Sequence, residues 1–502
     1  MLSCCASGPR IGLMLPYTPV HELLFTGNTP RLLVMTSANR PGCPVIIKNE
    51  DVLDAFSGRI DGFLLNNRAI ANRCDDSLLD LWQGKAYFFR RSRGYAPSPV
   101  SFSGDHTGIF AFGAEQKGSF ALGDGSRLFL PPHIGDLKNM ETFEHYETML
   151  KTYARLFKIR PKVLVCDRHP DYWSTALAKS IQKSHGLPLI QIQHHWAHMA
   201  SCMADNRYMF SKNPETAPAM AASVSAGTIL DTSVSPVEAF GIIWDGTGLG
   251  SDGTIWGAEF LKGNYSSFTR VGSIRPILLA GGDRAAKEVG RIALALLKDS
   301  GLPPGKAPLS DAKASMLYTL LDQPGVCPRA SSMGRLFDGV GALLKHCQEI
   351  SYDGEAAEAV EHLAASALTD EQSLMAGAAP YPLEFYEENG IRYFDTRPML
   401  RALVSDMESI STCQIARRFT ATLCHMALNQ TKALNPGHLP VFLSGGVFLN
   451  HLLRFGITRL LEANGYTVFT HHRVSPGDEG LALGQAVIAS ALYAQNEHPQ
   501  KR

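Results

Sequence analysis

The sequence predicts an α/β fold of two unequal domains, on three observations. Short apolar runs alternate with stretches of helical periodicity along the chain. Two segments, 109–122 and 240–260, have the apolar–glycine–apolar pattern of hairpins with glycine in the turn. A late apolar run at 441–443 leads directly into Ser444-Gly445-Gly446 and then a helical pattern.

The first domain is expected over residues 1–98. It begins abruptly on a strand-like run, and we expect it to be the later half of a domain. A Pro/Ser-rich hinge at 96–103 separates it from the rest of the chain. Its strands, flanked by short helices, are predicted at 11–15, 32–35, 45–47, 63–65 and 86–89.

The second domain is expected over residues 107–494. Besides the two hairpins, strands are predicted at 163–166, 189–193 and 441–443, and helices at 141–157, 284–297, 355–368 and 415–431. A polar, Ala/Ser/Pro-rich stretch at 211–236 has neither a helical nor an alternating pattern, which predicts a surface insertion.

Composition narrows the class of protein. The 502 residues carry no net charge, with 45% hydrophobic and 19% charged residues, which predicts a globular chain with no broad affinity for nucleic acid or anionic membrane. No apolar stretch is long enough to span a bilayer. The ten cysteines include no CxxC pair, which favours reduced thiols in a cytoplasmic enzyme.

The sharpest chemical motif is His194-His195-Trp196-Ala197-His198, directly after the strand at 189–193. If a helix begins there, His194 and His198 are i and i+4 and project from one face, as two ligands of a metal ion would. Asp478, in a Ser-Pro-Gly-Asp-Glu-Gly loop, is a third candidate ligand. The alternative is two solvated histidines and an ordinary turn.

Two glycine loops are candidates for nucleotide binding. Asp245 precedes Gly246, Thr247 and Gly248, an arrangement in which backbone N–H groups can approach phosphate and the carboxylate can approach its metal. Gly445 and Gly446, between a strand and a helix, can admit an adenosine. Each loop alone is more often a plain turn. Together and in this order they resemble the sugar kinase, Hsp70 and actin superfamily, whose two related halves clamp a nucleotide.

In the first domain, Ser37 and Asn39 follow the predicted strand at 32–35, and their side chains can hydrogen-bond a phosphate or a carbonyl. A capped turn is the competing interpretation. The cluster around Arg73 and the basic run at 90–93 can bind an anion or form surface ion pairs.

Thirteen runs, in the same order along the chain, make the sequence resemble the HypF carbamoyltransferases of [NiFe]-hydrogenase maturation. They are MLPYTPVHELL, VMTSANRPG, NRCDDS, FRRSRGYAP, HIGDL, CDRHPDYWST, QHHWAH, DGTGLGSDGTIWGAEF, GGDRAAKE, SSMGRLFDGVGALL, YDGEAA, SGGVFLN and SPGDEG. The resemblance implies a partial YrdC-like segment followed by a two-lobed, actin/Hsp70-like (TsaD-like) domain.

The resemblance also implies an activity. The YrdC-like domain of the family makes carbamoyl adenylate from carbamate, derived from carbamoyl phosphate, and ATP with Mg²⁺. The TsaD-like domain transfers the carbamoyl group to the C-terminal cysteine of HypE, for cyanide ligand synthesis. Carried over, His194, His198 and Asp478 hold one transition metal, zinc or iron; the first two, with Asp245, are catalytic. Nucleotide binding falls to Gly246, Thr247, Gly248, Gly445, Gly446 and Asn450, and the adenylate pocket to Ser37, Asn39 and Arg73.

Departures from the family pattern leave alternatives open. The acylphosphatase-like and zinc modules and the first half of the YrdC-like domain have no counterpart in these residues, so we expect a truncated member that does not make the adenylate unaided. One alternative is an actin-like-fold kinase of small molecules. The other is an inactive nucleotide-binding module that docks HypE.

Overall fold

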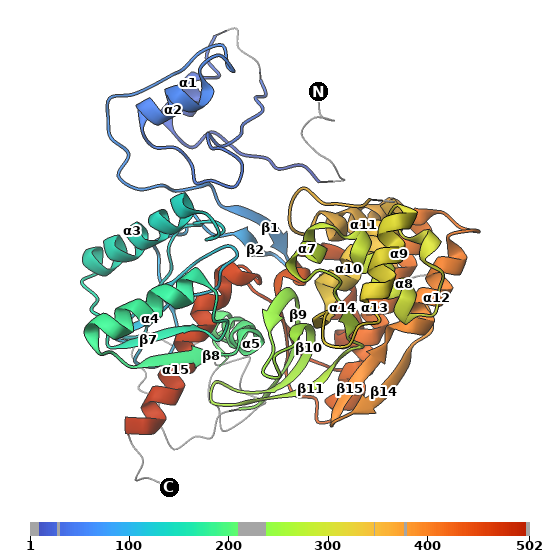
Figure 1. Cartoon of the computed structure of the whole chain (residues 1–502). Coiled ribbons are helices and arrows are strands. Elements are labelled where there is room, and N and C mark those ends of the chain that lie inside the picture. Colours follow the sequence, from blue (N-terminus) through green and yellow to red (C-terminus); the bar gives the residue numbers. More distant parts are fainter. Residues whose placement is uncertain (1–9, 28–30, 209–236, 346, 376–378, 498–502) are drawn as a thin grey trace.

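The computed structural model describes residues 10–27, 31–208, 237–345, 347–375 and 379–497, and the predicted insertion at 211–236 lies outside them. The first domain contains two short helices, α1 (Pro19–Leu23) and α2 (Asn49–Phe56), and one antiparallel hairpin, β1 (Leu78–Trp82) and β2 (Lys85–Arg90). Figure 1 shows this segment above the remainder of the molecule, joined to it at the hairpin.

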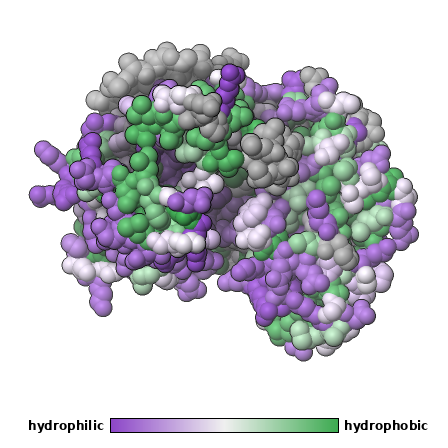
Figure 2. Space-filling model, turned by 90° about the horizontal axis from the view of Figure 1, so that it is seen from above, coloured by the Kyte–Doolittle hydropathy of each residue, from purple (hydrophilic) through white to green (hydrophobic). Residues whose placement is uncertain are grey.

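Four of the five strands predicted in the first domain are wrong, and only the one at 86–89 forms, as part of β2. Residues 11–15, 32–35, 45–47 and 63–65 are irregular. A strand needs a neighbour to pair its backbone groups, and none of the described residues supplies one here. Their apolar side chains are exposed instead: Leu13, Leu15 and Leu64 are 85%, 82% and 83% accessible. Figure 2, seen from the side of this segment, shows hydrophobic residues on that surface.

The second domain is built on two sheets. The first sheet has the order β3-β6-β5-β4-β7-β8. Strands β4, β5 and β6 are antiparallel, and β7 and β8 continue parallel to β4. The bounds are β3 (Val100–Ser101), β4 (Ile109–Ala111), β5 (Ala121–Asp124), β6 (Arg127–Phe129), β7 (Val163–Asp167) and β8 (Leu189–Ile192).

The second sheet repeats this pattern. Its path is β14-β15-β11-β10-β9-β16-β17, with β9, β10 and β11 antiparallel, β16 and β17 parallel to β9, and short β12 and β13 beside β10. The bounds are β9 (Ala239–Leu249), β10 (Ile255–Gly263), β11 (Phe268–Ile274), β12 (Ile277–Leu278), β13 (Arg329–Ser332), β14 (Glu384–Glu388), β15 (Ile391–Asp395), β16 (Val441–Ser444) and β17 (Val468–Phe469). Five strands of each sheet, β6-β5-β4-β7-β8 and β11-β10-β9-β16-β17, therefore share one order and one set of directions, and the predicted two-lobed architecture is confirmed.

Alternating side chains sort the domain into layers. Ile109 and Ala111 point into a core shared with α5 (His194–Asp205) and α15 (Leu481–Glu497), whereas Phe110 points to the opposite face, under α3 (Met140–Leu156) and α4 (Trp173–His185). In β9, Ile243 joins the same central core as α5 and α15, and Ile242 packs on the far side. The two helices α5 and α15 are thus sandwiched between the sheets (Figure 1).

The outer face of the second sheet carries a helical layer. Its helices are α7 (Asp283–Lys287), α8 (Gly290–Asp299), α9 (Asp311–Leu320), α10 (Met333–Lys345), α11 (Glu355–Ser366), α12 (Thr396–Asp406), α13 (Thr412–Leu434) and α14 (His451–Ala463). The single helix predicted at 284–297 is wrong, because the backbone of Glu288, with φ of −90° and ψ of 74°, leaves the helical region and separates α7 from α8. No helix among the described residues is long and apolar enough to cross a membrane.

Candidate functional site

Four side chains from separate parts of the second domain converge on one point. His194 and His198 lie on the first turns of α5, Asp245 lies on β9, and Asp478 begins a short 3-10 helix, η6 (Asp478–Gly480). Their ligand atoms all lie within 4.8 Å of one another. The helix begins at His194 because the side chain of Gln193 accepts a hydrogen bond from the backbone N–H of Trp196, which caps it. The predicted i, i+4 pair therefore forms, and Asp245 joins Asp478 opposite it.

The spacing of these atoms suits a metal ion better than direct hydrogen bonds. The Nε2 atom of His194 lies 3.4 Å from Asp245 Oδ2 and 3.6 Å from Asp478 Oδ1, and that of His198 lies 3.7 and 3.4 Å from the same atoms. Neither buried Nε2 has a hydrogen-bond partner among the described residues. Ligands about 2.1 Å from a tetrahedral zinc ion are separated by roughly 3.4 Å. Two imidazoles and two carboxylates thus form a donor set that fits zinc or iron.

Asp167, at the end of β7, orients the first of these ligands, and the sequence reasoning missed it. Its Oδ2 accepts a hydrogen bond from His194 Nδ1 at 2.8 Å, with both side chains buried. In the neutral ring the proton is therefore on Nδ1, so that the lone pair of Nε2 faces the other ligands. A signal was present, because β7 and β8 are parallel and Asp167 pairs with Ile192, so that Asp167 and the helix start follow neighbouring strand ends.

The electrostatics of the site favour a cation. Burial alone lowers the pKa of His194, but Asp167 and the two ligand carboxylates outweigh it, so this pKa lies well above its ordinary value. Burial raises the pKa of Asp245, but its attraction to the nearby His194 and His198 rings outweighs burial and holds this pKa well below its ordinary value. The carboxylates thus remain charged, and either a proton or a metal ion can balance them.

Both predicted glycine segments lie directly beside this cluster, but the one at 246–248 is the end of strand β9 and not a loop. The backbone N–H of Gly446, in η5 (Gly446–Leu449), donates to Asp245 Oδ1 at 3.0 Å, so one carboxylate faces both the cluster and the loop. Gly445 has φ of +101°, and a Cβ there would lie 2.1 Å from the Trp244 carbonyl oxygen, so this position requires glycine. A Cβ on Gly248 would lie 2.6 Å from the His195 ring.

Three further residues predicted to bind nucleotide lie within or directly after these two segments. Gly246 and Thr247 lie on β9, beyond Asp245. Asn450 uses its side-chain oxygen to cap α14, by accepting from Leu453 N at 2.9 Å. The start of α10 also approaches, since a Cβ on Gly334 would lie 2.8 Å from Gly246 Cα.

A buried carboxyl on α10, Asp338, was not predicted from the sequence. Burial, only partly offset by Arg335, raises its pKa to about 6. Its Oδ2 lies 2.8 Å from an Arg335 nitrogen, but in a geometry that makes no hydrogen bond. A buried carboxyl of this kind is an acceptor available to a hydroxyl group.

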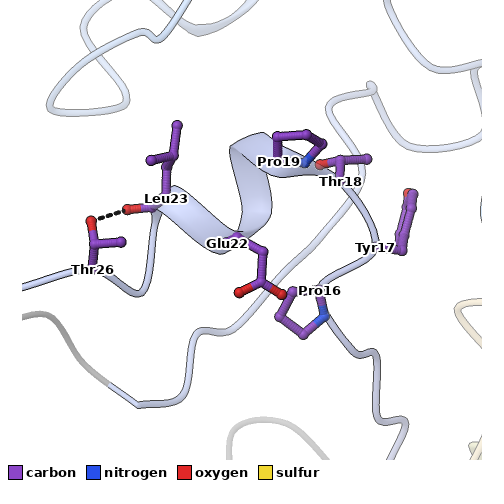
Figure 3. Close-up of a pocket in the computed structure, with 7 residues that line it drawn as sticks. All are labelled: Pro16, Tyr17, Thr18, Pro19, Glu22, Leu23 and Thr26. Carbon is purple, nitrogen blue, oxygen red and sulfur yellow. Dashed lines mark hydrogen bonds between the residues drawn. The ribbon is translucent and has the colours of Figure 1, made fainter.

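The candidate residues of the first domain form a separate group. Ser37 Oγ donates to Asn39 Oδ1 at 2.5 Å, and Arg73 Nε donates to the Val45 carbonyl at 2.7 Å. Ile46 N donates to the Ala38 carbonyl, so the segments that carry Asn39 and Arg73 both contact residues 45–46. A hollow beside α1 is distinct from this group (Figure 3). It is lined by Pro16, Tyr17, Thr18, Pro19, Glu22, Leu23 and Thr26.

The first domain contacts two loops of the second domain: the one that contains Gly445 and Gly446, and the one that contains Asp478. Tyr87, on β2, donates through its hydroxyl to the Phe448 carbonyl at 2.9 Å, and Phe448 follows the two loop glycines. The backbone N–H of Arg91 donates to Glu479 Oε1 at 2.7 Å, and Glu479 also lies 3.2 Å from His133 Nδ1. The hairpin thus packs against the glycine loop and against the residue next to Asp478.

Three family models match consecutive parts of the chain. Residues 2–92 match the Sua5/YciO/YrdC model, described as telomere recombination. Residues 104–205 match the HypF Kae1-like domain, and 241–485 match the second subdomain of the carbamoyltransferase Kae1-like domain. The first model covers the segment predicted to be YrdC-like, and the other two cover the two lobes.

Relatives and solved structures agree with these matches. The chain is 32% identical to carbamoyltransferase HypF of Synechocystis, over 95% of this chain and 59% of that protein, and 33% identical to HypF2 of Cupriavidus necator, over 95% and 60%. It therefore spans about three fifths of the length of these relatives. A shorter HypF homolog of Cupriavidus necator is 30% identical, over 79% of this chain and 96% of its own length.

One solved structure, of full-length HypF in the phosphate- and nucleotide-bound form, matches with a TM-score of 0.83 and 33% identity, over 96% of this chain and 71% of that one. Another, of HypF from T. kodakarensis, matches with a TM-score of 0.80 and 27% identity, over 97% and 61%. The chain belongs to the HypF carbamoyltransferase family.

Proposed function

We propose that this chain transfers a carbamoyl group from carbamoyl adenylate to the C-terminal cysteine of HypE, in the synthesis of the cyanide ligands of [NiFe]-hydrogenase. The observation that carries the proposal is the cluster of His194, His198, Asp245 and Asp478, adjacent to two glycine loops in a HypF-family fold. The solved HypF structure that is described as nucleotide-bound supports ATP as a ligand.

The cluster would hold one transition metal, zinc or iron, which supplies a Lewis acid able to polarise an acyl oxygen. Asp167 fixes the His194 ring, and Asp245 connects the metal ligands to Gly446. Gly445 and Gly446 leave room for the adenosine, and Gly246, Thr247 and Gly248 lie toward the phosphates, where backbone N–H groups can donate. Asn450, the N-cap of α14, follows the loop that contains Gly445 and Gly446.

The proposed division of labour follows two units, residues 1–98 and 107–494. Ser37, Asn39 and Arg73 in the first unit would bind the carbamoyl adenylate formed with ATP and Mg²⁺ from carbamoyl phosphate. Their hydroxyl, amide and guanidinium groups suit a phosphate and a carbonyl. The ten cysteines without CxxC spacing support a cytoplasmic location. A small-molecule kinase is less well supported, because kinases hold Mg²⁺ by oxygen ligands and not by two imidazoles.

The test supplies carbamoyl adenylate and HypE to the zinc-loaded chain and reads HypE by intact mass. We expect HypE to gain one carbamoyl group on its terminal cysteine. His194→Ala and His198→Ala should lose both bound zinc and transfer, whereas His185→Ala, an exposed histidine of α4, should lose neither. No gain on HypE with metal-loaded wild type would refute the proposal. Transfer that survives loss of the metal would refute the assigned role of the cluster.

A further inference from the structure

Three buried side chains behind the candidate site form a continuous hydrogen-bond chain. Ser444 Oγ lies 2.8 Å from His471 Nε2, and His471 Nδ1 lies 3.2 Å from Asp205 Oδ2. The side chains of His471 and Asp205 are fully shielded from solvent, and Ser444 is also inaccessible. The three residues are far apart in the sequence, so that only the fold brings them together.

The direction of each hydrogen bond follows from the chemistry of its members. Burial raises the pKa of Asp205, but the hydrogen bond from His471 and the charge of Arg473 outweigh it, so its pKa lies well below the ordinary value and the carboxylate can only accept. His471 must therefore donate from Nδ1, and in the neutral ring Nε2 then accepts from the Ser444 hydroxyl. Asp205 also accepts from the backbone N–H groups of His472, Arg473 and Val474.

This order of Ser, His and Asp is that of a nucleophilic triad, but its surroundings exclude that role. An attacking serine needs a substrate carbonyl next to its hydroxyl. Ser444 is 0% exposed, and its hydroxyl is bonded to a histidine that is itself buried. Among the described residues, this hydrogen-bond chain therefore has no route to a substrate. It can affect function only through the segments that it connects.

Those segments are the ones that carry the candidate site. Asp205 ends α5, the helix whose first turns hold His194 and His198. Ser444 directly precedes Gly445 and Gly446. His471 begins the loop that leads to Asp478. One buried chain thus joins the helix of the metal ligands, the glycine loop, and the loop of the last ligand.

We propose that the Asp205–His471–Ser444 chain positions the glycine loop relative to the metal ligands, and that His471 and Ser444 are positioning residues for nucleotide binding. The inference rests on the proposed function, because it concerns the same nucleotide loop. It adds to that function a fixed acceptor for the Ser444 hydroxyl, which holds the end of β16 so that Gly445 keeps its left-handed backbone close to the Trp244 carbonyl.

The experiment measures the Kd for ATP of the zinc-loaded full chain by calorimetry. We expect Ser444→Ala and His471→Asn each to weaken ATP binding about tenfold, a factor typical of one lost buried hydrogen bond. The double variant should bind no more weakly than either single variant, because both break the same contact. His471→Gln, whose longer amide can reach Ser444, should recover part of the affinity. Zinc content should remain that of the wild type throughout.

The matched control is His472→Asn, since His472 is the next residue and makes no side-chain hydrogen bond to Ser444 or Asp205 in the structure. Its ATP affinity should equal that of the wild type. Folded Ser444→Ala and His471→Asn with wild-type ATP affinity, or losses that add in the double variant, would overturn the inference. If His471→Asn does not fold, Ser444→Ala, which removes only a hydroxyl, decides the matter. Failure of the wild type itself to bind ATP would instead count against the proposed function.

Discussion

Asp167 offers the most stringent test of the metal cluster, because it is not one of the four candidate ligands and bonds only the His194 ring among them. Its hydrogen bond to Nδ1 is 2.8 Å long, and the two side chains are 1% and 0% accessible, so water does not screen the contact. Acceptors of this kind contribute 10- to 100-fold to metal affinity. We expect Asp167→Ala to weaken zinc binding about 100-fold, or about 2.7 kcal/mol.

Asp167→Asn separates the charge from the shape. The amide oxygen can still accept from Nδ1, but a neutral acceptor makes a bond about half as strong as a carboxylate. The expected loss is therefore about tenfold, or about 1.4 kcal/mol. Zinc affinity would be measured by competition with a chromophoric chelator, with Asp171→Asn, an exposed aspartate four residues on, as the control. A folded Asp167→Ala that holds zinc within twofold of the wild type would refute this role.

Three further predictions follow from single contacts. Gly445→Ala should lower the free energy of unfolding in urea by about 1–3 kcal/mol and abolish ATP binding, because φ at this position is +101° and the new Cβ meets the Trp244 carbonyl. Unchanged ATP affinity would contradict this prediction. Burial lowers the pKa of His106 from 6.5 to about 4, so the folded state resists protonation: stability is fully present above about pH 6.5 and falls as pH drops toward 4. Between pH 7.5 and 5 the loss from this group is about 2 kcal/mol by urea titration, and His106→Phe should remove it, whereas an equal loss in that variant would exclude His106 as the source. Tyr87→Phe should cost about 1 kcal/mol of unfolding free energy, since the Phe448 carbonyl keeps its bond from Arg454; a loss above about 3 kcal/mol would show that the hairpin docking depends on this hydroxyl more than the contacts imply.

Local patterns in the second domain were read correctly from the sequence. The hairpins at 109–122 and 240–260 form as β4–β5 and β9–β10, and three of the four predicted helices form within a few residues of the expected bounds. These features depend on side-chain period and on turn residues, which neighbouring positions carry. The exception, at 284–297, depends on the backbone conformation of Glu288. The hydrophobic periodicity of a segment does not predict a single dihedral angle.

The first domain shows where period alone fails. Residues 11–15 and 63–65 have the composition of strands, yet among the described residues they have no partner strand and remain irregular. Strand formation is decided by a neighbour that can lie anywhere in the sequence. The duplicated sheet order was expected only from the family resemblance, because equal topology does not require equal residues.

The sequence alone predicts the pair His194 and His198, since two residues four apart on one helix face the same way whatever surrounds them. It also determined the family, through thirteen motifs in order. Only the tertiary structure decided that Asp245 and Asp478 lie opposite this pair, that Asp167 holds one ring, and that Ser444, His471 and Asp205 meet behind it. Those contacts join residues tens to hundreds of positions apart, and their geometry arises from the packing of two sheets around α5 and α15, which no local spacing encodes.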